Sequence, residues 1–123
     1  MRYWVIGLGF FALAACGSAR TPEELRDDTP AEVVSSLKNF EELYVFLDDR
    51  IRTCHGSGGN QIKSDLYADR GRGAVAIHKD GAYSLLVEIF KSPEGYGSQI
   101  TVHSHDEALG ERVQGWLQGE AGC

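Results

Sequence analysis

Residues 74–90 read AVAIHKDGAYSLLVEIF, and this stretch decides the fold. Two apolar runs, residues 74–78 and 83–90, lie on either side of Asp80 and Gly81. Asp-Gly is a preferred pair for a two-residue β-hairpin turn, because both positions need a positive φ. The stretch therefore predicts an antiparallel hairpin. A two-residue loop sets its register as His78 opposite Tyr83, Ala76 opposite Leu85 and Ala74 opposite Val87.

This register divides the hairpin into two faces, because successive side chains of a strand point to opposite sides. One face combines the alanines with Tyr83, Leu85, Val87 and Ile89. Small residues leave room for a helix, so we expect helices to cover this face. The opposite face is then a candidate interaction patch with Phe90 as its anchor; its members are Val75, Ile77, Leu86 and Phe90. Two alternatives stay open: another segment covers the patch, or the two faces are reversed.

Two further apolar runs, residues 62–67 and 99–104, flank the hairpin and predict two more strands. Turn residues separate each of them from the hairpin, at residues 69–71 and 93–95. Short connections between successive strands favour an antiparallel meander. The sequence therefore predicts a four-stranded sheet.

A helix is predicted before the sheet. Thr29 can cap its start, Pro30 suits the first helical position, and Glu32 can return the capping hydrogen bond. The apolar residues that follow are spaced by three or four, as one face of a helix requires; they are Val33, Leu37, Phe40, Tyr44, Leu47 and Ile51. Asn39 and Glu42 offer a second capping box, which leaves open a break or restart there.

A second helix is predicted after the sheet. Ser104 and Glu107 form another capping pair. The apolar side of this helix consists of Leu109, Val113, Trp116 and Leu117. Residues 29–123 are therefore expected to form one α+β domain, in the order α-β-β-β-β-α. Both helices are expected on one face of the antiparallel sheet.

The N-terminus is typical of an export signal. Arg2 is followed by an uncharged, mostly apolar run, residues 3–15, which is too short to cross a bilayer as a helix. The run ends in Leu13-Ala14-Ala15-Cys16, followed by Gly17 and Ser18. This motif resembles the lipobox of bacterial lipoproteins at every position.

The lipobox resemblance implies a lipid anchor. Residues 1–15 would be a signal peptide removed by signal peptidase II, and Cys16 would carry the covalent lipid that holds the protein to a membrane leaflet. By the same resemblance, Gly17 implies the periplasmic leaflet of the outer membrane, because an aspartate at this position favours the inner membrane in related lipoproteins. Residues 16–28 are rich in charge, with Leu25 the one sizeable apolar side chain from Gly17 onward, and are expected to form a flexible tether.

The remaining cysteines, Cys54 and Cys123, are expected to form a disulfide, because an oxidising envelope compartment favours pairing. The bond would close a loop of about 70 residues and contribute about 4 kcal/mol by chain entropy. A metal site or an exposed redox thiol is the alternative, although the sequence contains no C-x-x-C motif.

No catalytic motif is evident, so we expect a protein that is not an enzyme. The net charge of −6 disfavours nucleic acid as a partner. The favoured function is a membrane-anchored binding or structural module of the cell envelope, with an envelope protein as a partner and no cofactor beyond the lipid. The alternative is a zinc or copper site at His103 and His105, completed by His55, His78 or Asp106.

Overall fold

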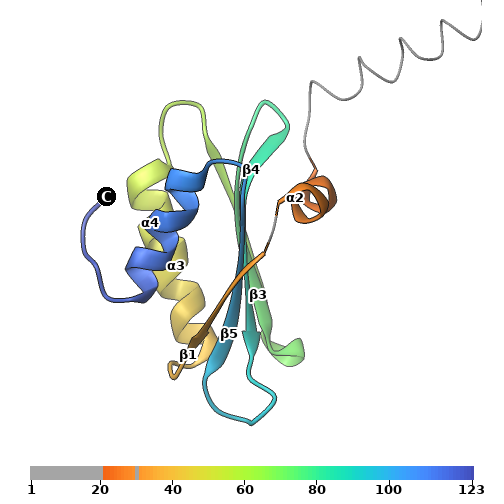
Figure 1. The fold of residues 1–123 in the computed structure, drawn as a ribbon, viewed down its shortest axis with the longest axis vertical. Helices are drawn as coiled ribbons and strands as arrows, with labels where there is room; N and C mark the ends of the chain where they lie inside the picture. Colours follow the sequence, from red (N-terminus) through yellow and green to blue (C-terminus); the bar gives the residue numbers. More distant parts are fainter. Residues whose placement is uncertain (1–20, 30) are drawn as a thin grey trace, which may run out of the picture.

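A five-stranded antiparallel sheet lies at the centre of the protein (Figure 1). The computed structural model describes residues 21–29 and 31–123. The strands are β1 (Glu32–Ser36), β2 (Gln61–Tyr67), β3 (Arg72–Lys79), β4 (Ala82–Lys91) and β5 (Ser98–Ser104). They lie in the order β1-β5-β4-β3-β2. Strands β2 to β5 form the predicted meander, and β1 is an unpredicted fifth strand that pairs with β5.

The α-helices of the described residues cover both faces of the sheet. Helices α3 (Phe40–His55) and α4 (Glu107–Leu117) lie on one side, which we call the inner face (Figure 1). Helix α2 (Pro22–Asp28) lies on the opposite side, the outer face. The fold is therefore α+β, as predicted, but helices on one face alone were expected. Within the described part of the chain, no helix is long and apolar enough to cross a membrane.

The hairpin of β3 and β4 forms around the predicted turn. Asp80 and Gly81 both have positive φ, 52° and 83°, as this turn requires. His78 lies opposite Tyr83, as predicted. Beyond that pair a β-bulge shifts the register, so the two other predicted pairs are wrong. The observed partners are Ile77 with Leu85, Ala76 with Leu86, Val75 with Val87, and Ala74 with Glu88.

The bulge explains the difference because it adds one residue, Ser84, to β4 without a partner on β3. A one-residue shift moves every later side chain to the other face. Val75 and Ile77 therefore point to the inner face with the large residues of β4. The turn sequence alone does not reveal such an insertion.

The main core lies between the inner face and helices α3 and α4. Its buried residues are Phe40, Leu43, Leu47, Ile51, Val75, Ile77, Leu85, Val87, Ile89, Ile100, Val102, Val113 and Trp116. The helical members follow the spacing of three or four that one helix face requires. The predicted apolar faces pack on the sheet from Phe40 onward. Val33 and Leu37 lie outside the helix and are exposed, and Leu43 joins the core without having been predicted.

The segment before α3 is a strand, so the prediction of a helix starting at Thr29 is wrong. Residues 32–36 are Glu-Val-Val-Ser-Ser, and their valines suit a strand. Pairing with β5 decides the conformation, because it satisfies the backbone groups of β1. Helix α3 starts where a restart was left open: Asn39 is its N-cap and accepts a hydrogen bond from the Glu41 amide at 2.7 Å.

Residues 22–28 form α2, so their interpretation as part of a flexible tether is wrong. Thr21 and Glu24 make a reciprocal capping box at the start of the helix. Leu25 is fully buried against the outer face of the sheet. The tether interpretation failed because one apolar residue in a charged segment gives no periodic pattern.

Helix α4 begins later than predicted. Ser104 ends β5, and Asp106 is the N-cap, whose side chain accepts a hydrogen bond from the Ala108 amide at 3.0 Å. The expected Ser104 cap is therefore wrong. The sheet extends to Ser104 because β4 still pairs there, with Leu85 as its partner.

Candidate functional site

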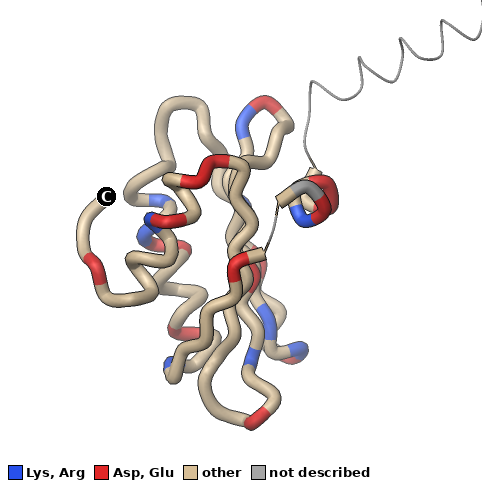
Figure 2. The backbone as a smooth tube through the Cα atoms, in the orientation of Figure 1, with Lys and Arg blue, Asp and Glu red and all other residues tan. Residues whose placement is uncertain are grey.

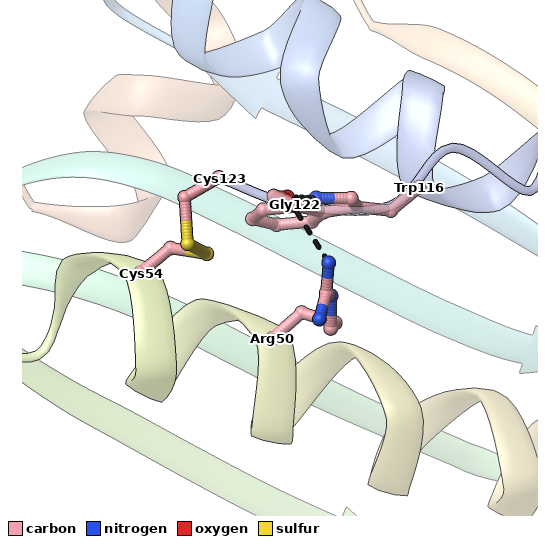
Figure 3. The surroundings of a disulfide bond; sticks show 5 residues. All are labelled: Arg50, Cys54, Trp116, Gly122 and Cys123. Carbon is pink, nitrogen blue, oxygen red and sulfur yellow. Dashed lines mark hydrogen bonds between the residues drawn. A yellow bond between two sulfur atoms is a disulfide. The ribbon is translucent and has the colours of Figure 1, made fainter.

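The two helices of the inner face are joined covalently. Cys54, near the end of α3, and Cys123, in the tail after α4, form a disulfide with a Cα–Cα distance of 5.5 Å (Figure 3). These are the two cysteines expected to pair. The two cysteines are 69 positions apart in the sequence. Their bond closes the chain between them into a loop and limits how far the two helices can separate.

Hydrogen bonds hold the tail against both helices. The carbonyl oxygen of Gly122 accepts one from the Trp116 indole at 2.8 Å and one from the Arg50 guanidinium at 3.0 Å (Figure 3). The Arg50 guanidinium also lies 5.8 Å from the centre of the Trp116 ring. The disulfide and these hydrogen bonds together fasten the C-terminal tail to α3 and α4. Both cysteines therefore have a structural role.

The four residues predicted to form an interaction patch do not share a face. Val75 and Ile77 are buried in the main core beneath the helices. Leu86 points to the outer face, but α2 covers it and leaves it 4% exposed. Phe90 is half-buried, with the Arg72 guanidinium 5.5 Å from its ring centre. The predicted patch is therefore wrong, because the bulge places its β3 and β4 members on opposite faces.

The outer face instead carries a small apolar cluster that α2 completes. We call the sheet residues beneath α2 the groove, and they are Ala74, Ala76, Tyr83 and Leu86. Helix α2 packs against β4 and β5. Leu25 enters a small apolar cluster with Ala76 and Leu86, and the half-buried Ala74 and Tyr83 pack around it. The two alanines of β3 have short side chains, so they leave the space that Leu25 fills.

A buried carboxylate lies beside this groove. Glu88 of β4 is 6% exposed. Arg26 of α2 donates two hydrogen bonds to it, from Nε at 3.1 Å and from Nη2 at 3.0 Å. The Arg72 guanidinium approaches the same carboxylate at 3.4 Å. Hydrogen bonding to Glu88 raises the pKa of Arg26, and the two-bond geometry is the strong form of such a pair.

The sequence did not identify this ion pair. Glu88 is the one acidic residue within the apolar run of residues 83–90, and nothing near it in the sequence indicates a partner. Its partner Arg26 lies 62 positions earlier, in a segment interpreted as tether. The sequence shows an apolar residue, Leu25, next to a cation, Arg26. Only the docking of α2 on the sheet shows that Leu25 packs against the outer face and that Arg26 pairs with Glu88.

The two histidines of the metal alternative are placed differently. His103 is buried on the outer face, with its Nδ1 3.5 Å from the Thr29 hydroxyl. His105 follows β5 and is exposed, and its backbone amide donates to the Ser84 carbonyl oxygen at 3.0 Å. Among the described residues, no group of three or more His, Cys, Asp or Glu side chains gathers around a common point.

An open cavity lies where the end of α3 meets the start of α4. It is lined by His55, Asn60, Ile77, Ser84, Asp106, Ala108, Leu109 and Arg112. The Nε2 atom of His55 is buried there without a hydrogen-bond partner within the described residues. Burial lowers the pKa of His55, the charge of Arg112 lowers it further, and Asp106 opposes both effects.

Comparisons with protein-family models, curated proteins and solved structures find no match to this chain. The lipobox, including Cys16, lies outside the described residues. The outer face, with its short covering helix and buried carboxylate, is therefore the candidate site that the geometry itself provides.

Proposed function

We propose that this protein is a lipid-anchored lipoprotein of the bacterial cell envelope. Its domain would act as a non-enzymatic binding or structural module in envelope assembly or maintenance. The membrane leaflet, reached through the lipid on Cys16, is one partner, and an envelope protein is the other. Gly17 favours the periplasmic leaflet of the outer membrane as the location.

The use of the three cysteines carries this proposal. The Cys54–Cys123 pair accounts for two of them, and the third, Cys16, is the last residue of the lipobox motif. Disulfides are typical of exported proteins, because the cytosol keeps thiols reduced. The lipobox and the disulfide thus support the same compartment independently.

The outer face supports the binding role. The inner face is covered by two longer helices, whereas the outer face has one seven-residue helix, α2, in the described part of the chain. This helix directly follows the segment expected to carry the lipid. A partially covered sheet face next to the anchor suits a surface that meets another envelope component.

Lipid attachment is tested by metabolic labelling with radioactive palmitate. The wild-type chain should incorporate the label, and Cys16→Ser should not. The Cys16→Ser variant should also keep its signal peptide, because signal peptidase II acts on the lipid-modified cysteine. Cys54→Ser is the matched control, since it removes a cysteine outside the lipobox and should still be labelled. Label in the Cys16→Ser variant would contradict the proposal.

A further inference from the structure

Helix α2 is too short to be stable by itself. It has seven residues, whereas isolated helices shorter than about 12 residues are marginal in water. Its conformation therefore depends on its contacts with the outer face and on its capping box. Among the described side chains, the anchors of α2 are one fully buried apolar residue, Leu25, and one ion pair, Arg26 with Glu88, while its C-cap Thr29 lies 3.5 Å from His103.

The position of α2 makes its release compatible with an intact domain. None of its residues belongs to the main core, and Leu25 lies in a separate small cluster. The Arg26 side chain is 39% exposed and the Glu88 side chain 8%, so water reaches the ion pair from the side of α2. Segments with few buried contacts open locally before the rest of a protein unfolds. Helix α2 is therefore a replaceable occupant of the groove.

The groove defines what could replace α2. Ala74, Ala76 and Leu86 require an apolar side chain, since they would otherwise meet water. Glu88 requires a cation, because a buried carboxylate that loses its partner is strongly destabilising. Arg72 remains at 3.4 Å, but it contributes a single contact where Arg26 contributes two. A purely apolar partner is thus disfavoured.

We propose that the groove on the outer face is a docking site for a helical segment of an envelope protein. That segment presents a large apolar residue followed by an arginine or lysine, and it displaces α2, which occupies the groove in the free protein. Such recognition of an amphipathic helix in a groove is a recurrent binding mode. The inference deepens the proposed binding role, on which it rests only for the partner's location in the envelope.

The groove is tested with a helix-stapled peptide of residues 21–29, TPEELRDDT, added to the full chain. Two variants release α2 without altering the groove: Leu25→Asp removes its apolar contact, and Arg26→Glu opposes Glu88 with a like charge. Both should bind the peptide at least about tenfold more tightly than the wild type, because α2 no longer competes. Fluorescence anisotropy measures the affinities. Equal affinities for wild type and both variants would overturn the proposal.

Charge recognition is tested in the same assay. A peptide with glutamate in place of its arginine should lose most of the binding to the Leu25→Asp chain. Adding Glu88→Gln to that chain should weaken binding of the original arginine peptide. The chain should then also discriminate less between the arginine peptide and the glutamate peptide. Undiminished binding of the glutamate peptide would show that the groove does not select a cation, which would overturn the proposal.

The partner is identified by cross-linking in cells. A benzophenone amino acid replaces Tyr83, at the border of the groove, in the full chain carrying Arg26→Glu. Mass spectrometry should locate the adduct in a helical segment of another envelope protein with an apolar-basic pair. An adduct with a second copy of this chain, with a segment lacking that pair, or with nothing would overturn the proposal. Palmitate labelling remains separate: its failure would reject the anchor and leave the peptide results valid.

Discussion

The two faces of the sheet are covered in different ways. The inner face buries its side chains beneath α3 and α4, and a disulfide links the end of α3 to the tail that follows α4. The outer face has α2, which contributes Leu25 and an ion pair to a cluster of three buried residues, Leu25, Ala76 and Leu86 (Figure 1). The inner face thus contains the main core of the domain, whereas one short helix covers the outer face.

Charge distribution differs in the same way. The inner core consists of apolar residues, whereas the outer face includes the buried Glu88 and places charged α2 over it (Figure 2). An apolar surface discriminates only weakly between different apolar partners. A buried carboxylate, in contrast, selects for a partner that brings a cation. The buried Glu88 thus gives the outer face a charge requirement that the apolar inner face lacks.

Removal of the disulfide should have the largest effect on the inner face. The double variant Cys54→Ser, Cys123→Ser should lose about 4 kcal/mol of unfolding free energy, because the unfolded chain is no longer closed into a loop. Urea denaturation measures the loss, and the reduced wild type should show the same value. A loss below about 1 kcal/mol would mean that packing alone holds the two helices.

Two adjacent leucines of β4 compare the faces directly. Leu85 points to the inner face and is fully buried, and Leu86 points to the outer face with 4% exposure. Leu85→Ala should cost about 3 to 4 kcal/mol, and Leu86→Ala about 2 kcal/mol, because a thin cover can collapse into the vacated space. Urea midpoints of the two variants give the difference. Equal losses would show that α2 packs as rigidly as the inner helices.

The pH dependence of His55 should give the smallest effect. Its pKa is lowered in the folded protein, by burial and by Arg112, from an ordinary value of 6.5. Below about pH 6.5 the unfolded chain binds a proton that the folded protein resists, so stability falls as the pH falls from 7 to 5. Asp106 moderates this loss.

Replacement of His55 checks that assignment. His55→Gln should reduce the slope of unfolding free energy against pH over this interval, while the exposed His105→Gln serves as the substitution control. Thermal melts in a series of buffers provide the slope. An unchanged slope in the His55 variant would assign the acid sensitivity to other groups.

Local signals in the sequence determined several parts of this protein. The Asp80-Gly81 turn, the meander of β2 to β5 and the apolar stripe of α3 follow from patterns within a few residues. The pairing of Cys54 with Cys123 followed from counting cysteines. Such features need only nearby residues or chemistry shared by all exported chains, so they can be read without knowing the fold.

Tertiary contacts alone decided the rest. The bulge at Ser84 sets which face Val75 and Ile77 occupy, and it depends on packing across the sheet. Residues 32–36 become a strand because β5 offers them backbone partners. Residues 22–28 have a local capping box at Thr21 and Glu24, but so short a helix also needs the outer face, which accepts Leu25 and Arg26. In each case the stabilising partner lies far away in sequence, and its contacts override the local preference of the segment.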